Sequence, residues 1–451
     1  MATTLAFTVK RSAPELVAPS RATPRELRPL SDIDDQDGLR FYRSGLHFFR
    51  GRSGGGAGAG ADPAAVVRRG LADALVHYYP VAGRIREVGA PARKLVVDCT
   101  GDGVVFVEAD ADVSLSDFGD VLCPPFPCYQ ELLCEPDGNC AAVVGRPLLF
   151  IQVTRLRCGG FVLGLQICHN IADAAGTVQL LRAIGEMSRG MPAPTVPPVW
   201  ARELLMARSP PVVTHMHPEY DETAAGGNHD VLGHHEPLVQ RAFFFGPKEM
   251  SALRELAAPA AGAGGATAGK RISRFDMLAA FLWQRRAAAL EYDDDDEVRV
   301  MFVVNARGRS PPLPAGFYGN AFAFAVAACT AGRLRDSPLA DVVGMVAGAK
   351  ARAASEGNLQ SVADLMAQCG RPRFGRAART YLVSDVTRAG FEGVDFGWGE
   401  GAYGGPAAAT LATFHLTVKD ASGEDVIAVP MCLPPAAMER LELDVQVSLN
   451  H

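Results

Sequence analysis

The chain has 451 residues, of which 48% are hydrophobic and 21% are charged. This length exceeds what one hydrophobic core usually serves, so we expect two domains of roughly 200 residues each. The composition excludes a disordered or fibrous protein. Forty-four basic and fifty acidic residues give a formal net charge of −6, and no long basic block interrupts this balance. A nucleic-acid partner is therefore not expected.

The cysteines and the termini indicate a reduced, non-membrane environment. The ten cysteines are scattered along the chain, and the four from Cys123 to Cys140 lack the paired C-x2-C spacing of a zinc site. We therefore expect reduced thiols and no metal. No segment approaches the ~20 apolar residues of a membrane helix, and neither a secretory signal nor a Ser-Lys-Leu peroxisomal address is recognised. These features favour a cytoplasmic protein with no membrane partner.

Helix and strand patterns alternate along the chain. After Asp62 and Pro63, apolar residues recur at three- and four-residue steps, which predicts a helix that ends near Pro80. Ser273 and Asp276 predict a capping box at the start of a second helix. Apolar runs predict strands over residues 161–168, 298–304, 322–327 and 426–431. The sum is an α/β protein with mixed sheets.

A proline-rich stretch separates the two halves. Residues 191–238 show little periodicity, so we expect an interdomain crossover there, between an N-terminal domain at 1–190 and a C-terminal domain at 239–451. The five histidines of this stretch lack cysteine partners or a helix that fixes their spacing, so a polar loop is favoured over a metal site. These histidines are His215, His217, His229, His234 and His235.

Two segments match the letters of catalytic motifs but lack the structure that those motifs require. Residues 51–55 match G-x-S-x-G, yet glycines follow Ser53 where a nucleophile elbow needs a helix. Residues 264–270 match G-x-x-x-x-G-K, yet Arg271 stands where the magnesium-binding Ser or Thr belongs. A nucleotide triphosphatase is disfavoured, and a serine hydrolase that uses Ser53 is kept as a rival hypothesis.

The pattern H-x-x-x-D occurs twice, at residues 169–173 and 217–221. The second copy lies in the proline-rich crossover. The first copy follows the predicted buried strand and precedes small residues and a helical pattern, which places His169 at a strand end with room for a substrate. Asp173 then lies on the following turn, where it can organise the loop. A general base and a histidine held by a strand-end hydrogen bond are both compatible with this pattern.

Near the C-terminus, residues 395–399 read Asp-Phe-Gly-Trp-Gly, a composition that favours a structural turn. Together with H-x-x-x-D, this motif resembles the plant BAHD acyltransferases, which move acyl groups from coenzyme A thioesters to alcohols or amines. The likeness spans nearly the whole chain. Residues 384–390, Ser-Asp-Val-Thr-Arg-Ala-Gly, are similar to the subgroup of benzyl alcohol O-benzoyltransferases and related alcohol acyltransferases. Further similar segments are 30–34, 78–84, 305–320, 361–365 and 403–406.

The resemblance implies a fold and a catalytic pair. It implies two chloramphenicol acetyltransferase-like domains with mixed sheets, an interdomain channel and a monomer. His169 corresponds to the base that takes the proton of the acceptor hydroxyl, with no covalent enzyme intermediate. Asp173 corresponds to the acid that points away from the pocket and pairs with an arginine, for which Arg307 is the candidate.

The resemblance also implies further binding and structural residues. Lys270, Arg271 and Ser273 correspond to the mouth that meets the nucleotide phosphates, and a basic pair beside a helix N-terminus suits an anion. Thr387 and Arg388 correspond to the lining of the acyl or acceptor pocket. The structural support near the coenzyme A channel corresponds to Asp395, Gly397, Trp398 and Gly399.

The implied substrates are an acyl-CoA donor and a small alcohol, with no permanently bound cofactor. Benzoyl-CoA with benzyl alcohol is the first hypothesis, and a hydroxycinnamoyl or acetyl donor with another alcohol or an amine is the alternative. Ala174 replaces the Gly that many members carry after the Asp, although the benzoyl subgroup often has the same Ala. The segment after Pro406 is shorter than the resemblance implies, and this shortening puts the benzoyl preference, more than the activity, in question. A non-catalytic acyl-CoA-binding protein is the rival class, although such a protein has no need of His169.

Overall fold

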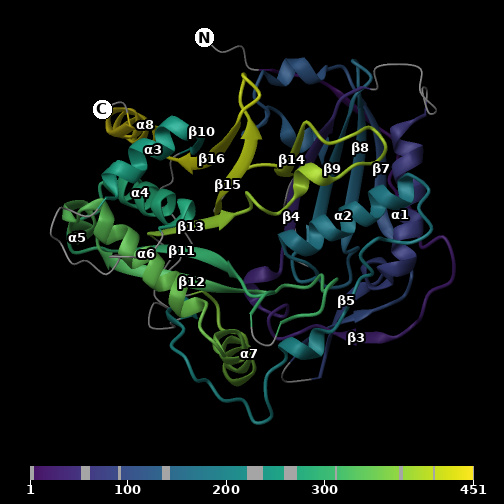
Figure 1. Cartoon of the computed structure of the whole chain (residues 1–451). Helices are drawn as coiled ribbons and strands as arrows, with labels where there is room; N and C mark the ends of the chain where they lie inside the picture. The colour runs from purple at the N-terminus through teal and green to yellow at the C-terminus, as the bar shows by residue number, and fades with distance from the viewer. Residues whose placement is uncertain are drawn as a thin grey trace.

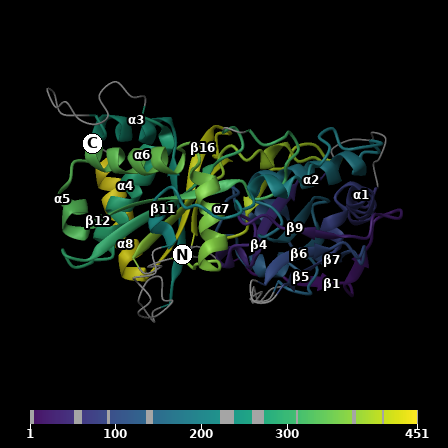
Figure 2. The same cartoon turned by 90° about the horizontal axis from the view of Figure 1, so that it is seen from below.

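The structure is a computed structural model of the whole chain. It describes residues 5–51, 61–89, 93–134, 143–220, 237–258, 272–309, 312–374, 379–409 and 412–449. Figures 1 and 2 show two helix-covered sheets lying side by side, the N-terminal one near α1 and α2 and the C-terminal one near α3 to α6. The expected mixed α/β architecture is confirmed.

The first sheet is built mainly by the N-terminal half and runs in the order β1-β7-β8-β9-β4-β14, with β2 also paired to β7. Its pairs are antiparallel except β7 with β8. Helices α1 and α2 pack on this sheet through a shared apolar core. The elements are β1 (Val9–Arg11), β2 (Glu15–Val17), β4 (Tyr42–Phe49), α1 (Pro63–His77), β7 (Val104–Ala111), β8 (Leu149–Leu156), β9 (Phe161–Cys168), α2 (Ala174–Ser188) and β14 (Tyr403–Pro406).

The second sheet runs in the order β10-β16-β15-β13-β11-β12, and β13 is parallel to both β11 and β15. Helices α3, α4, α6 and α8 bury their apolar faces against it. A separate small sheet of β3 (Leu27–Pro29), β6 (Lys94–Asp98) and β5 (Arg84–Val88) packs into the core of the first sheet. The C-terminal elements are β10 (Val239–Phe245), α3 (Pro247–Leu256), α4 (Arg274–Ala289), β11 (Glu297–Asn305), β12 (Phe322–Thr330), α5 (Ala331–Asp336), α6 (Leu339–Ala353), α7 (Asn358–Cys369), β13 (Thr380–Asp385), β15 (Ala412–Lys419), β16 (Asp425–Leu433) and α8 (Pro435–Leu449).

The four strands predicted from apolar runs are all present, as β9, β11, β12 and β16. The first predicted helix begins at Pro63, where the carboxylate of Asp62 caps the N–H groups of Ala64 and Ala65, and it ends at His77 rather than near Pro80. The predicted capping box of α4 is half formed. Ser273 Oγ accepts from the N–H of Asp276 at 3.1 Å, but the carboxylate of Asp276 binds Lys350 Nζ of α6 instead of closing the box.

The two sheets follow the predicted division at 1–190 and 239–451 except for one strand. Strand β14, from the C-terminal half, pairs with β4 of the first sheet, and Tyr403 lies opposite Phe48. The domain boundaries themselves stay a prediction. No helix among the described residues is long and apolar enough to span a membrane.

The described part of the crossover carries a buried ion pair. Nη1 of Arg202 lies 2.9 Å from both carboxylate oxygens of Asp34, and both side chains are fully buried. The guanidinium also lies over the ring of Trp200, 4.6 Å from its centroid. Asp34 further accepts from the backbone N–H and side-chain amide of Asn320, at 2.9 and 2.8 Å. The crossover therefore helps to hold the two halves together.

Removal of this buried cation is expected to destabilise the fold strongly. Arg202→Met leaves the carboxylate of Asp34 buried without its counter-ion, which costs about 3–5 kcal/mol of unfolding free energy. Chemical denaturation measures this loss. The matched control is Arg241→Met, whose partner Glu442 and own side chain are each 42% exposed, and which should cost about 1 kcal/mol or less. Equal losses in the two variants would contradict the assigned importance of Arg202.

Candidate active site

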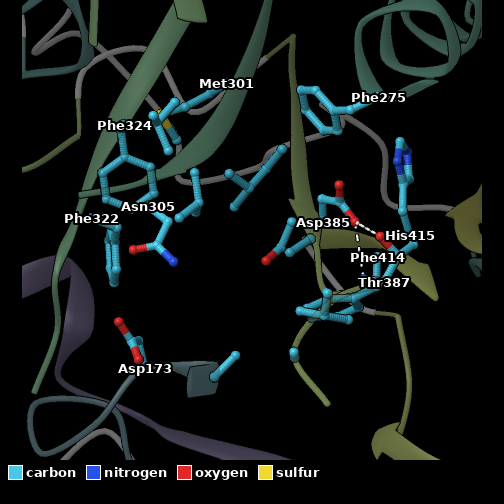
Figure 3. A pocket seen from close by; sticks show the side chains of 18 of the residues that line it. Asp173, Phe275, Met301, Asn305, Phe322, Phe324, Asp385, Thr387, Phe414 and His415 are labelled. Carbon is cyan, nitrogen blue, oxygen red and sulfur yellow. Dashed lines mark hydrogen bonds between the residues drawn. The ribbon is translucent and has the colours of Figure 1, made fainter. Parts of the chain in front are cut away.

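A cavity of about 2000 Å³ lies between the two sheets and is lined by residues of both. The N-terminal half contributes the start of β4 and the turn between β9 and α2, and the C-terminal half contributes β11, β12, β13 and β15. Figure 3 shows Asp173 across the cavity from the group of Asp385, Thr387 and His415, with Phe322, Phe324 and Met301 along one wall. Predicted site residues from both halves line this cavity, so it is the candidate site for substrate binding.

His169 directly follows β9 and lines this cavity. The residue is 7% exposed, and its ring packs edge-on against Phe41 and Phe322, with centroids 5.1 and 6.1 Å away. Burial, and then the positive charge of Arg43, lower the pKa of His169 to about 3. The imidazole is therefore neutral at physiological pH, which is the form that can accept a proton.

The neighbouring guanidinium indicates which nitrogen of His169 carries the lone pair. Nη1 of Arg43, on β4, lies 3.4 Å from Nε2 of His169. A guanidinium only donates, so this contact favours the tautomer with the lone pair on Nε2 and the proton on Nδ1. Nε2 is therefore the nitrogen that carries the lone pair of the neutral imidazole.

The turn after β9 is held by side-chain amides and by Arg202. Asn320 Nδ2 donates to the carbonyl of His169 at 2.7 Å, and Arg202 Nη2 donates to the carbonyl of Ile171 at 2.7 Å. Asn170 Nδ2 in turn donates to the carbonyl of Asp34 at 2.6 Å. The same groups that satisfy the buried carboxylate of Asp34 thus fix the peptide units that carry His169.

Asp173 is tied to the C-terminal half. Arg307 donates from Nη1 to Oδ2 at 2.6 Å and from Nη2 to Oδ1 at 2.8 Å, so the contact expected between these residues is present. The carboxylate also accepts from the N–H groups of Gly176 and Ala321, at 3.0 and 3.1 Å. Asp173 forms part of the cavity wall, whereas the resemblance implied a side chain turned away from it. Its four donors make it a structural acceptor at the junction of the halves.

Thr387 and Arg388 line the cavity, as expected. The hydroxyl and the N–H of Thr387 both donate to Asp385 Oδ1, at 2.7 and 3.0 Å. Next to them, His415 on β15 is 1% exposed, and burial lowers its pKa to about 4. Sequence reasoning missed His415 and Arg43, since each lies in a strand outside any motif. A titratable side chain within a mostly apolar strand was the available signal.

Of the three residues expected at the phosphate mouth, the structure places one. Ser273 lines the cavity, caps α4 and accepts from Lys350 Nζ at 3.0 Å. Lys270 and Arg271 lie outside the described residues, as does Ser53. Their roles stay predictions.

His217, of the second H-x-x-x-D copy, is not among the described residues that line the cavity. The ring of His217 contacts Glu219 Oε1 at 3.1 Å and Ser361 Oγ at 2.8 Å, which explains it as a structural histidine. Asp221 of that copy and His229, His234 and His235 lie outside the described residues. Within the part of the chain that the structure describes, no group of three or more His, Cys, Asp or Glu side chains could hold a metal ion.

The segment at residues 395–399 forms a turn packed on the first sheet. Oδ1 of Asp395 accepts from the N–H groups of Gly397 and Gly399, at 2.7 and 2.8 Å. Trp398 packs edge-on against Phe161 of β9, with centroids 5.2 Å apart. Of the described residues that line the cavity, none comes from this turn. Its contacts fit the structural support expected of it.

Two sheets that share a cavity, with a neutral histidine at a strand end between them, define the class of two-domain acyltransferases. The chain belongs to the Transferase family, the BAHD acyltransferases, whose model matches residues 7–447. The expected resemblance is therefore confirmed.

The protein is 50% identical over 452 residues to a benzyl alcohol O-benzoyltransferase of Petunia hybrida, covering 98% of this chain and 94% of that one. It is 45% identical over 477 residues to acyl transferase 1 of Oryza sativa subsp. japonica, covering 98% and 96%. Its fold is similar to that of vinorine synthase, with a TM-score of 0.71 and 21% identity over 98% of each chain. It is also similar to F. graminearum TRI101 complexed with coenzyme A and deoxynivalenol, with a TM-score of 0.69 and 15% identity over 93% and 97%.

Loss of the charge on Asp173 is expected to weaken the junction of the halves. Asp173→Asn keeps the size of the side chain but removes the ion pair with Arg307 and one acceptor oxygen, so the unfolding free energy should fall by about 1–3 kcal/mol. Thermal denaturation measures this. Asp425→Asn is the control, because Asp425 pairs with Lys419 while 63% exposed. Unchanged stability of Asp173→Asn would show that the ion pair does not hold the junction.

Proposed function

We propose that the protein transfers a benzoyl or related acyl group from coenzyme A to a small alcohol, with His169 as the general base. It is an acyltransferase with acyl-CoA as co-substrate. The observation that carries the proposal is the neutral imidazole of His169, a residue that lines a cavity shared by both sheets.

The reaction requires no covalent bond to the enzyme. The hydroxyl of the alcohol gives its proton to Nε2 of His169 while its oxygen attacks the thioester carbonyl. The tetrahedral intermediate then expels the thiolate of coenzyme A, which takes the proton back from the imidazolium. The products are an ester and free coenzyme A, and the histidine returns to its neutral form.

The walls of the cavity support an aromatic acyl group or an aromatic alcohol. Aromatic and thioether side chains gather on the wall nearest His169, where flat apolar surface favours a phenyl ring. These side chains are Phe41, Met301, Phe322, Phe324 and Phe374. Pro406 and Ala408 line another part of the cavity, so the short segment after Pro406 borders the substrate. The alternatives are a hydroxycinnamoyl or acetyl donor and an amine acceptor.

The phosphates of coenzyme A are proposed to lie near the N-terminus of α4. Ser273, Arg274, Lys350 and Arg254 line this part of the cavity, and the positive end of a helix dipole adds to their attraction for phosphate. Lys270 and Arg271 precede this helix in the sequence and are proposed to join them. A monomer and a cytoplasmic location are also proposed, the first because the resemblance implies it.

Coenzyme A thiol release tests the function. Purified protein is crossed with benzoyl-, coumaroyl- and acetyl-CoA and with benzyl alcohol, hexanol and a polyamine. We expect release that depends on both substrates and falls by a factor of about 100 or more in His169→Ala, because the general base is lost. His217→Ala, from the second H-x-x-x-D copy, is the control that should keep activity.

Three outcomes would contradict the proposal. Loss of activity in Ser53→Ala with full activity in His169→Ala would favour the serine hydrolase. Binding of acyl-CoA without release for any pair would favour a binding protein. Release that needs no acceptor would indicate a thioester hydrolase.

The pH dependence of kcat/KM tests the state of His169. A base with a pKa near 3 stays deprotonated far below the ordinary value of 6.5, so kcat/KM should stay level down to about pH 5. The folded-state pKa lies below the unfolded one, so the stability contribution of this group is full above 6.5 and is lost as the pH falls toward 3. Rates are therefore compared only where the melting temperature is constant. A fall of about tenfold per pH unit below 6.5 would contradict a neutral, buried His169.

A further inference from the structure

A cation, Arg43, lies beside the proposed base in the cavity, and the proposed reaction gives this cation no role. Arg43 lies on β4, is half-buried, and forms part of the cavity wall. Its Nη1 is 3.4 Å from Nε2 of His169. Among the residues that the structure describes, no carboxylate forms an ion pair with Arg43. The nearby carboxylate of Asp173 instead holds Arg307 with both of its oxygens.

The buried positive charge of Arg43 carries a desolvation cost. Burial lowers the pKa of Arg43, which means that the surroundings disfavour its charged form. A neutral side chain at this position would avoid this cost. A cation without a counter-ion at the wall of a substrate cavity is physically suited to a ligand that brings the anion.

We propose that Arg43 is a specificity-determining residue that binds a carboxylate on the acceptor, so that the preferred acceptors are hydroxy acids. The ligand of Arg43 is assigned as the acceptor because the acceptor hydroxyl has to lie next to Nε2 of His169. This assignment rests on the proposed function. Arg43 donates to the carboxylate while His169 accepts from the hydroxyl of the same molecule.

The distance between the two groups limits how far apart the hydroxyl and the carboxylate are. Nη1 of Arg43 and Nε2 of His169 are 3.4 Å apart. A ligand oxygen hydrogen-bonded to either nitrogen lies about 2.8 Å from it, and both oxygens belong to one ligand on the same side of the pair. The two ligand oxygens then lie about 3–5 Å apart by this geometry. The carboxylate is therefore attached to the carbinol carbon or to the carbon next to it, as in an α- or β-hydroxy acid. The aromatic wall accommodates a phenyl ring on that acid.

Such an acceptor would also strengthen the base. The charge of Arg43 is the second largest cause of the low pKa of His169, after burial. A carboxylate bound to Arg43 offsets that charge. The pKa of His169 is then higher in the complex than in the free enzyme, closer to the operating pH at which a general base works best.

Matched acceptors test the proposal. Mandelate, an α-hydroxy acid, and tropate, a β-hydroxy acid, both carry a phenyl ring, and each has a neutral methyl ester with the same hydroxyl. The measured quantity is kcat/KM for coenzyme A release with benzoyl-CoA. We expect the wild-type protein to prefer at least one acid over its ester by about tenfold or more, because the ester leaves Arg43 without an anion.

Variants of Arg43 test whether this residue causes the preference for the acid over its ester. Arg43→Met is expected to abolish the preference for the acid, and Arg43→Lys to keep part of it. Arg241→Met, on the exposed surface, is the control that should change neither acceptor. A wild-type preference for the esters, or an acid preference that survives in Arg43→Met, overturns the proposal. An equal loss of kcat with every acceptor in Arg43→Met also overturns it, because Arg43 would then act on the reacting atoms and not on acceptor choice.

Binding separates this proposal from the proposed function. If wild-type protein releases no coenzyme A with any donor and acceptor, the proposed function fails, and calorimetric binding of mandelate and methyl mandelate then decides the role of Arg43. Tighter binding of mandelate that is lost in Arg43→Met supports the carboxylate site. Equal binding of the two, or no binding of either, overturns it.

Discussion

The carboxylate of Asp34 is fully buried, and a buried ion has to be surrounded by donors. Those donors come from segments far apart in the sequence. Ser31 supplies a hydroxyl at 2.6 Å, the crossover supplies Arg202, and the C-terminal half supplies Asn320. Because Arg202 and Asn320 also hold the carbonyl groups of the turn that carries His169, the requirement to satisfy one charge also positions the base.

A second connection, around the first turn of α2, brings the halves together. Asp173 caps this helix while it binds Arg307 from the other half. The approach is close: a Cβ at Gly176 would lie 1.9 Å from the carbonyl oxygen of Tyr318. The small residue is therefore needed where segment 318–320 crosses the helix. The cavity opens directly beside this junction, so both halves contribute walls around one histidine.

Local patterns predicted much of this arrangement. Strand β9 and the turn after it follow from a continuous apolar run that ends at His169, and Asp62 with Pro63 marks the start of α1. The resemblance identified Arg307 as the partner of Asp173. What the sequence could not predict depends on pairing between distant segments. Strand β14 joins the first sheet because β4 offers it an edge, and Asp276 leaves its capping box because Lys350 of α6 comes within reach.

The same limit explains the cavity residues that were missed. Arg43 and His415 lie in strands outside any motif, and their meaning is visible only when β4 and β15 face one space. The central claim is that this space allows direct transfer between two bound substrates at His169. Intact-protein mass spectrometry after mixing with benzoyl-CoA alone tests it most directly. The account predicts an unchanged protein mass and no stoichiometric release of coenzyme A until alcohol is added. A benzoylated protein formed without alcohol would contradict it.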